Sequence, residues 1–370
     1  MGPWDAWVRA ESLAIDAAGQ WRTLRTVEGG GTRVRLDGLT EPVVSFASND
    51  YLGLAHHARV RAAAADAADR FGAGVGSSRL IAGERSVHRD LEAALASLCG
   101  CEAALAFPTG YQANLAVLTT FGAHARIISD ELNHASIIDG ARLARGELVI
   151  YRHGDAEHAL DLAATAPGRA VIVTDTVFSM DGDVAPISAL SAGCARHQAL
   201  LVLDDAHAVL PVDVPDPGAP CLRVGSLSKT FGAQGGYVAG PRPWIDLIVN
   251  RARSFVYTTG LSPADAAAAA AAVALCSSEE GERLRLRLRG HMEMLRPGHP
   301  TPIIPIVIGD ERKALDAARV LFEQGLFVPT IRPPTVPAGS SRLRISLSAA
   351  HEAGDVARLA GALADLGHIG

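Results

Sequence analysis

One lysine of this sequence stands where covalent chemistry needs a lysine. Lys229 lies in the segment Val224–Gly232, among serine, threonine and glycine residues and after a short apolar run. A lysine that forms a Schiff base needs a desolvated amine on a rigid element, and nearby hydroxyl groups can hold a phosphate. A surface lysine on a turn has the same short motif, so Lys229 alone does not decide between the two.

Two further residues favour the Schiff-base interpretation. Asp204 precedes Lys229 by 25 positions and ends another apolar run, and His207 follows Asp204 three positions later. A carboxylate placed there can pair with a protonated pyridine nitrogen and keep a pyridoxal phosphate ring electron-withdrawing. His207 can hydrogen-bond the phenolic oxygen of that ring, although a histidine that starts a helix gives the same pattern. Together the three residues predict a pyridoxal 5'-phosphate site.

Another histidine and one turn extend the candidate site. His134 precedes an expected helix over residues 136–145, where its ring can stack on an aromatic cofactor or cap the helix. The segment Pro108–Asn114 joins an expected strand to an expected helix over residues 112–121. Backbone N–H groups at such a helix N-terminus favour a phosphate dianion.

The elements that must position these residues alternate between strands and helices. Short apolar runs predict buried strands at 104–107, 126–129, 148–151, 170–174, 199–203 and 222–224, and helical spacing separates most of them. This alternation predicts a mostly parallel sheet covered by helices, with its site at the carboxyl ends of the strands. After Thr301 a strand, a helix and a strand are expected at 303–308, 313–324 and 343–347.

These patterns predict an α/β fold with a large, mostly parallel sheet domain and a small C-terminal α/β domain. A chain of 370 residues is too long for one ordinary core. We expect an N-terminal segment over residues 1–45, a cofactor-binding domain over 46–245 and a small domain over 246–370.

The composition limits the class of protein. Apolar residues make up 48% of the chain and charged residues 20%, and the net charge is −6. These values are typical of a globular protein and give no attraction to nucleic acid or an anionic membrane. The five cysteines include no Cys-x-x-Cys pair and the histidines have no metal-ligand spacing, so we expect no metal site. The apolar run Ala266–Cys276 is too short for a membrane span, and no signal-peptide pattern is seen, so a cytoplasmic location is expected.

Several strings resemble those of a known enzyme family. They are Ser45–Leu54, Phe178–Asp183, Asp204–His207 and Ser226–Lys229, and the likeness runs from about Arg22 to Leu366. The chain resembles the α-oxoamine synthases, which are fold-type I pyridoxal-phosphate enzymes of the aspartate-aminotransferase-like fold. They condense an amino acid with an acyl thioester.

A second group of strings resembles one branch of this family. They are Ile331–Pro337, Arg342–Arg344 and Ala349–Glu352. The branch condenses L-alanine with a pimeloyl thioester, carried by coenzyme A or a carrier protein, in biotin biosynthesis. The resemblance therefore implies these two substrates, and it implies a homodimer.

The resemblance also implies a role for each matching residue. Lys229 would be the Schiff-base residue and proton carrier, with Asp204 on the pyridine nitrogen, His207 on the phenolic oxygen and His134 stacked on the ring. Ser179 would touch the ring oxygen or the reacting groups. The phosphate would be held by Gly110, Tyr111 and Ser226, with Thr258 or Thr259 reaching in from a partner subunit. Substrate binding is implied for Arg344 at the amino-acid carboxylate and for Arg22 at the distal carboxylate of the acyl chain, with Asn49 in the same pocket.

The sequence departs from its family at four places, one of which is the stretch from Glu279 to Pro302, which is shorter than in relatives. Ala208–Asp213 replaces a Gly-Thr-Gly run after His207, Ser226 replaces a common threonine, and Asp175 replaces a common glutamate.

Other interpretations of the chain's function are consistent with the same residues. They are a sister synthase that uses glycine or serine with another acyl thioester, an aminotransferase, and an inactive protein of the same fold. Release of free thiol distinguishes a synthase from an aminotransferase.

Overall fold

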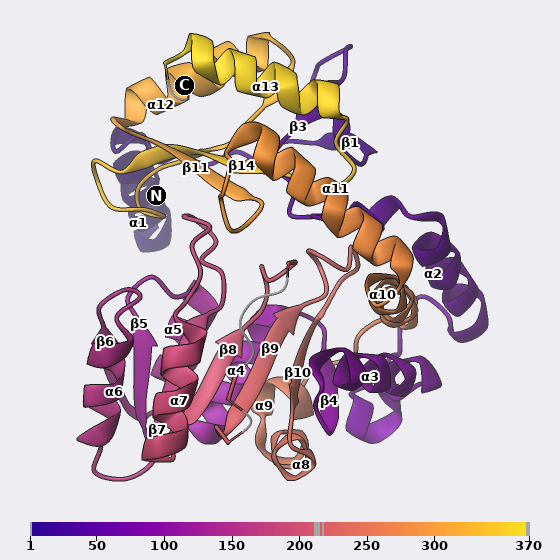
Figure 1. The fold of residues 1–370 in the computed structure, drawn as a ribbon, viewed down its shortest axis with the longest axis vertical. Coiled ribbons are helices and arrows are strands. Elements are labelled where there is room, and N and C mark those ends of the chain that lie inside the picture. Colours follow the sequence, from indigo (N-terminus) through magenta and orange to yellow (C-terminus); the bar gives the residue numbers. More distant parts are fainter. Residues whose placement is uncertain (1, 211–214, 217, 368–370) are drawn as a thin grey trace.

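The chain folds into a large sheet layer and a smaller layer above it (Figure 1). The computed structural model describes residues 2–210, 215–216 and 218–367. The helices are α1 (Pro3–Ala17), α2 (Ala58–Phe71), α3 (Ser86–Cys99), α4 (Gly110–Phe121), α5 (Ala135–Ala144), α6 (Ala156–Ala164), α7 (Ile187–His197), α8 (Arg242–Arg251), α9 (Arg253–Val256), α10 (Pro263–Cys276), α11 (Glu279–Leu295), α12 (Glu311–Glu323) and α13 (Ala353–Asp365). The strands are β1 (Val27–Gly30), β2 (Arg33–Leu36), β3 (Val43–Ser45), β4 (Ala103–Phe107), β5 (Arg126–Asp130), β6 (Glu147–Tyr151), β7 (Ala170–Asp175), β8 (Leu200–Asp204), β9 (Cys221–Ser226), β10 (Gly236–Gly240), β11 (Ile303–Gly309), β12 (Leu326–Phe327), β13 (Thr330–Ile331) and β14 (Ser341–Ser346).

The large sheet has the strand order β4-β10-β9-β8-β7-β5-β6. Strands β5 to β9 pair in parallel, whereas β10 is antiparallel to both of its neighbours, β4 and β9. The prediction of a mostly parallel α/β sheet is therefore confirmed. Helices cover both faces, with α4, α5, α8 and α9 packed on one and α6 and α7 on the other.

Two strands differ from the sequence expectation. The run at 148–151 was expected to be buried, but β6 is the edge strand of the sheet and its Ile150 side chain is 49% exposed. An edge strand has only one neighbour, so an apolar run does not by itself mean burial. Strand β10 was not expected, because its five residues begin and end with glycine and glycine is depleted in strands.

The smaller layer combines residues from both ends of the chain. One sheet has the order β11-β14-β13, and the other has the order β1-β2-β3-β12, in which Leu326 of β12 pairs in parallel with Val44 of β3. The predicted strands at 303–308 and 343–347 and the helix between them are confirmed as β11, β14 and α12. Helix α11 runs from this layer toward the large sheet (Figure 1), and its Leu288 and Met292 belong to a core shared by both layers.

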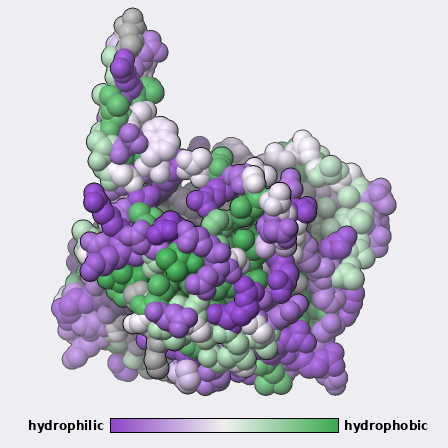
Figure 2. Space-filling view, turned by 90° about the horizontal axis from the view of Figure 1, so that it is seen from above, coloured by the Kyte–Doolittle hydropathy of each residue, from purple (hydrophilic) through white to green (hydrophobic). Residues whose placement is uncertain are grey.

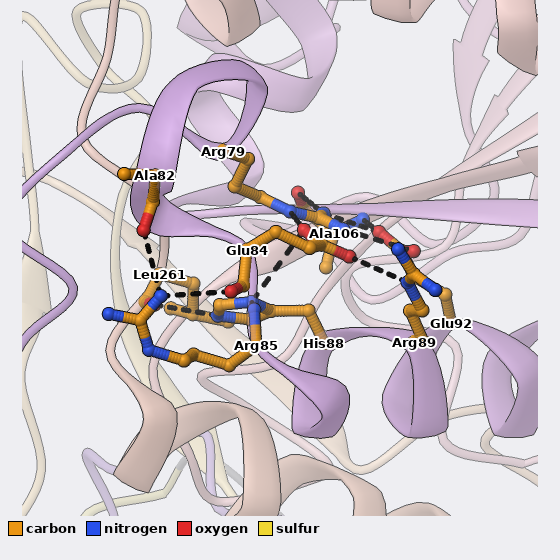
Figure 3. Close-up of polar contacts among 9 residues, drawn as sticks. All are labelled: Arg79, Ala82, Glu84, Arg85, His88, Arg89, Glu92, Ala106 and Leu261. Atoms are coloured by element: carbon orange, nitrogen blue, oxygen red, sulfur yellow. Dashed lines mark hydrogen bonds and ion pairs between the residues drawn. The ribbon is translucent and has the colours of Figure 1, made fainter. Parts of the chain in front are cut away.

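A buried ion network fixes the segment between α2 and α3 (Figure 3). The Arg79 guanidinium, only 8% exposed, lies 2.5 Å from a carboxylate oxygen of Glu84 and 2.5 Å from one of Glu92. It also donates to the carbonyl of Ala106 on β4 at 3.3 Å. Because three elements supply its partners, Arg79 ties this segment to the edge of the large sheet.

Helix α1 packs differently from all the other long helices. It has no buried residue, and Trp4 and Trp7 are 76% and 55% exposed. Figure 2 shows the column that it forms, standing away from the body of the molecule. A helix with apolar residues and no partner lacks the packing that stabilises most helices in proteins.

Candidate active site

Strand ends bring the predicted residues to one pocket. Asp175 at the end of β7 is paired with Asp204 at the end of β8, and Asp204 with Val224 of β9. The turns that follow these strands carry His207 and Lys229. The pocket at this edge is lined by Gly110, Tyr111, His134, Ser179, Asp204, His207, Ser226 and Lys229, among others. All eight were proposed from the sequence for cofactor binding.

Asp204 is a buried carboxylate held in one orientation. The Asn114 side chain donates to its Oδ2 at 2.6 Å and the backbone N–H of Ala206 donates to its Oδ1 at 2.9 Å. Asn114 is itself fixed by a 2.9 Å bond to the Ser136 hydroxyl. Sequence reasoning gave Asn114 no role, because an asparagine inside a helix does not reveal which distant residue its side chain contacts, here Asp204.

The Lys229 amine is poised to lose its proton. Burial lowers its pKa, and the carboxylates of Asp204 and Asp175 oppose this without cancelling it. A lysine in such a place has more of its neutral, nucleophilic form at neutral pH than a surface lysine has. This is the property that a Schiff-base lysine needs.

Asp175 positions His134. Its carboxylate accepts the backbone N–H of His134 at 2.9 Å, and its own N–H donates to the Asn133 side chain at 2.9 Å. Burial, and then the neighbouring Asp204 carboxylate, raise the pKa of Asp175 well above its usual value. The shorter Asp175 side chain, where the family commonly has glutamate, thus still reaches the start of α5.

His134 caps α5, and its ring also lines the pocket. Its Nδ1 accepts the Ser136 backbone N–H at 3.2 Å and lies 2.7 Å from the Ser136 hydroxyl. An Nδ1 that accepts leaves the ring proton on Nε2. The capping interpretation is therefore realised, and the exposed ring remains open to a partner in the pocket.

The first turn of α4 presents free donors to the pocket. Within the described residues, the backbone N–H groups of Gly110 and Tyr111 have no acceptor, while Thr109 accepts the Gln112 N–H at 3.1 Å. Ser226 and Ser228 add hydroxyl groups, 2.8 Å apart. Strand β10 approaches this turn so closely that a Cβ on Gly236 would lie 2.4 Å from Gly110 Cα.

This set of donors fits pyridoxal phosphate. Free N–H groups at a helix N-terminus and two hydroxyls suit a phosphate, a buried carboxylate suits a protonated pyridine nitrogen, and a desolvated amine suits the aldehyde. Within the described ranges, no group of three side chains is arranged to hold a metal ion.

Arg344 and Asn49 contact each other, although neither is among the residues that line the pocket described above. Arg344 is 5% exposed, and its two terminal nitrogens both lie 3.2 Å from Asn49 Oδ1. Its Nε donates to the carbonyl of Ser179, and Nη1 donates to the Ser346 hydroxyl at 2.8 Å. The guanidinium fork is therefore directed at an amide oxygen, which occupies the kind of place that a carboxylate oxygen would take.

Other predicted residues lie outside this pocket in the single chain. Arg22 is exposed, and in the part of the chain that the structure describes it has no hydrogen-bond or ion-pair partner. The Thr258 hydroxyl accepts from the Gln112 side chain at 3.3 Å, but neither Thr258 nor the exposed Thr259 lines the pocket. Of the altered loop after His207, residues 211–213 lie outside the described residues.

Tyr51 is a further site residue that sequence reasoning did not single out. Its hydroxyl lies 2.6 Å from His207 Nδ1 and 3.2 Å from Asn49 Oδ1. The string Ser45–Leu54 contained it, but only its position in space connects it to His207, which is 156 residues away in sequence.

Comparisons with known proteins agree with this geometry. The family described as aminotransferase class I and II matches residues 41–363. Proteins named 8-amino-7-oxononanoate synthase from Anaeromyxobacter dehalogenans and from Methylobacterium sp. are each 47% identical to the chain, covering 97% and 98% of it and 96% and 97% of their own lengths. The chain belongs to the 8-amino-7-oxononanoate synthase family.

Solved structures of similar fold extend this result. The serine palmitoyltransferase of Sphingomonas wittichii is 29% identical, with a TM-score of 0.89 and 98% of each chain covered. The serine palmitoyltransferase of S. paucimobilis, solved with bound PLP, is 26% identical with a TM-score of 0.89 and the same coverage. An 8-amino-7-oxononanoate synthase from Francisella tularensis is 23% identical and shares the fold, with a TM-score of 0.72 over 88% of this chain and 97% of its own. The fold is therefore that of the fold-type I pyridoxal-phosphate enzymes, as the sequence predicted.

Proposed function

We propose that this protein is a pyridoxal-phosphate-dependent 8-amino-7-oxononanoate synthase that condenses L-alanine with a pimeloyl thioester. One observation carries the proposal: a buried lysine amine and an oriented Asp204 carboxylate line one pocket, and Ser179 of the same pocket contacts the buried Arg344 fork, in a chain whose relatives bear that name at 47% identity. The thioester carrier is either coenzyme A or a carrier protein, as the resemblance implies.

Different residues of the pocket would hold different parts of the cofactor. The start of α4, at Gly110 and Tyr111, and the hydroxyl of Ser226 would hold the phosphate. Asp204 would hold the pyridine nitrogen, His207 the phenolic oxygen and His134 the ring face, with Ser179 beside the reacting groups. When bound, the cofactor withdraws electrons from Cα of the amino acid and makes its proton acidic.

Arg344 and Lys229 act on the amino acid. The Arg344 fork binds the carboxylate through two parallel hydrogen bonds, and Asn49 moves aside from the fork to admit it. This fixes Cα near Lys229, whose Nζ, with its pKa lowered by burial, accepts the Cα proton and later returns it. Exclusion of water by the buried walls of the site strengthens both interactions.

The overall reaction balances as a decarboxylative condensation. The Cα–H bond of L-alanine breaks as its proton passes to Lys229, and a carbon–carbon bond forms between Cα and the thioester carbonyl carbon. The carbon–sulfur bond breaks to release a thiolate, which takes a proton from solvent. The bond from Cα to its carboxyl group breaks to release carbon dioxide, and a proton replaces it on Cα. No oxidant or reductant is consumed.

The proposal includes a homodimer in the cytoplasm. Thr258 or Thr259 would then reach the phosphate of the partner's site, and Arg22 would meet the distal carboxylate of the acyl chain. The exposed tryptophans of α1 support a surface that binds a partner, because exposed apolar side chains do not stabilise a monomer. In the described residues, no helix is long and apolar enough to cross a membrane.

A substrate panel tests the proposed function. The purified, cofactor-loaded protein is mixed with pimeloyl-coenzyme A and L-alanine, glycine or L-serine, and free thiol and product mass are measured. We expect thiol release with L-alanine and a product of the mass of 8-amino-7-oxononanoate. Release only with glycine or L-serine would instead assign a sister synthase, and amino-group transfer without thiol release would assign an aminotransferase.

A further inference from the structure

The buried hydroxyl of Tyr51 lies between two acceptors that belong to different parts of the site. The Tyr51 side chain is fully buried, and its oxygen is 2.6 Å from His207 Nδ1 and 3.2 Å from Asn49 Oδ1. His207 faces the proposed cofactor, whereas Asn49 faces the proposed carboxylate site on Arg344. Tyr51 therefore contacts both a residue that lines the pocket and a residue of the proposed carboxylate site.

A hydroxyl has a single proton, so Tyr51 can donate to only one of these acceptors at a time. Burial raises the pKa of Tyr51, despite the opposing charge of Arg344, so the hydroxyl keeps its proton. If the proton goes to Asn49, then His207 Nδ1 must donate to the Tyr51 oxygen. If the proton goes to His207, then Nδ1 must be unprotonated.

The direction of the hydrogen bond between Tyr51 and His207 decides which ring nitrogen of His207 carries a proton. Burial, and then the positive charges of Lys229, Arg344 and His134, lower the pKa of His207 well below its usual value, so the ring is neutral and has one proton. When Nδ1 accepts from Tyr51, that proton is on Nε2, the nitrogen left for the pocket. When Nδ1 donates, Nε2 is bare and cannot donate to a cofactor oxygen.

The arginine fork helps to hold Asn49 Oδ1 within reach of the Tyr51 hydroxyl. Asn49 Oδ1 receives both terminal nitrogens of Arg344 at 3.2 Å and the Ser346 hydroxyl at 3.4 Å. A carboxylate is a stronger acceptor for a guanidinium than an amide is, so it displaces Asn49 from the fork. Asn49, no longer held by the fork, is then free to turn away from Tyr51 and to stop competing for its proton.

We propose that Tyr51 is a positioning residue that couples docking of the substrate carboxylate at Arg344 to the tautomer of His207. An occupied fork directs the Tyr51 proton to His207 Nδ1 and places the imidazole proton on Nε2, toward the pocket. The ring loses one proton and gains another by exchange with solvent in the pocket, so its charge is unchanged. The inference rests on the proposed function only for the identity of the carboxylate.

Nitrogen NMR of the histidine rings tests the coupling directly. The cofactor-loaded protein is labelled at histidine nitrogen, and the His207 signals are assigned from their loss in His207→Gln. Asn49→Ala removes the competing acceptor without any ligand, so we expect Nε2 to shift to its protonated position and Nδ1 to its unprotonated position. Tyr51→Phe removes the donor, and we expect the Nδ1 signal to lose its hydrogen-bond shift.

The ligand arm uses propionate, which is L-alanine without its amino group and so cannot react with the cofactor. At concentrations that suppress L-alanine binding, propionate should shift His207 as Asn49→Ala does, whereas neutral propionamide should not. The proposal is overturned if Asn49→Ala or fork-filling propionate leaves the His207 signals unchanged. It is also overturned if propionate shifts them equally in Tyr51→Phe.

Kinetics separate positioning from folding and from the proposed function. In Tyr51→Phe we expect kcat for the accepted amino acid to fall about tenfold, with little change in its KM, because Arg344 is intact. Loss of thermal stability with unchanged His207 signals would mean a structural role only. If L-alanine proves not to be the substrate, the NMR result is unaffected, so the two failures are distinguishable.

Discussion

Lys229 is the residue on which the reaction depends most. Its amine is buried and has a lowered pKa, and it lies in the pocket with Asp204 and His134. We expect Lys229→Ala to lower thiol release by about a thousandfold or more, because both covalent cofactor attachment and proton transfer at Cα are lost. The visible absorption of the reconstituted protein should change as well. Full activity in this variant, measured with L-alanine and pimeloyl-coenzyme A, would contradict the assignment.

Arg344 and Arg342 form a matched pair for testing carboxylate recognition. Both lie buried on β14, but Arg342 pairs with Asp181 while the Arg344 fork holds Asn49. Lysine has no planar fork, so Arg344→Lys should raise KM for L-alanine about tenfold to a hundredfold. Arg342→Lys should leave this KM within about twofold, since its partner is a protein carboxylate. Equal KM values in the two variants would exclude Arg344 as the carboxylate site.

The residues that sequence reasoning found and missed differ in how their signal is carried. Lys229, Asp204 and His207 each follow a strand and have side chains with few purely structural uses. Asn114 and Tyr51 act by touching those residues across the fold, and such contacts leave no pattern of spacing. Their roles therefore required coordinates.

At the scale of elements, the approach of β10 to α4 shapes the phosphate site. A side chain at Gly236 would collide with the backbone of Gly110, whereas one at Gly240, on the same strand, would meet mainly the flexible Leu222 side chain. Gly236→Ala should therefore displace the start of α4 and weaken pyridoxal phosphate binding about tenfold or more, as measured by equilibrium dialysis. Gly240→Ala serves as the control and should keep cofactor affinity. Equal affinity in both variants would show that the helix start does not hold the phosphate.

The Arg79 network should contribute strongly to stability. Glu92→Gln removes one of the two carboxylates on a nearly buried guanidinium while Glu84 remains, which should cost about 1.5–3 kcal/mol. The exposed pair of Arg319 with Glu323, whose side chains are 61% and 60% exposed, is the control, and Glu323→Gln should cost about 0–1 kcal/mol. Urea unfolding measures both. Similar losses in the two variants would contradict the burial argument.

Elements with strong periodicity were predictable, and those defined by their neighbours were not. The runs that became β7 and β8 are apolar up to their last one or two residues, and both strands are buried throughout. The run that became β6 has a similar composition but lies at an edge, because no strand follows it in the sheet order. Strand β10 is formed mainly because β4 and β9 offer it two sets of backbone partners.

At the scale of the whole molecule, the exposed apolar residues of α1 predict association. We expect sedimentation equilibrium to give twice the mass of one chain. Trp4→Ser combined with Trp7→Ser should raise the dimer dissociation constant at least tenfold, since buried tryptophans often dominate interfaces. Ile150→Ser on β6, which also replaces an exposed apolar side chain, is the control. A monomer at micromolar concentration, or no effect of the double substitution, would exclude this interface.

The pairing of β3 with β12 affects how the protein folds during its synthesis. Val44 pairs with Leu326, and β4 pairs with β10, so neither sheet can form completely until most of the chain has left the ribosome. Contacts this distant in sequence slow folding and leave apolar strands uncovered in the meantime. We therefore expect the nascent chain to need chaperone binding through most of its synthesis, and the chaperone concentration to limit the yield of folded protein in a heterologous host.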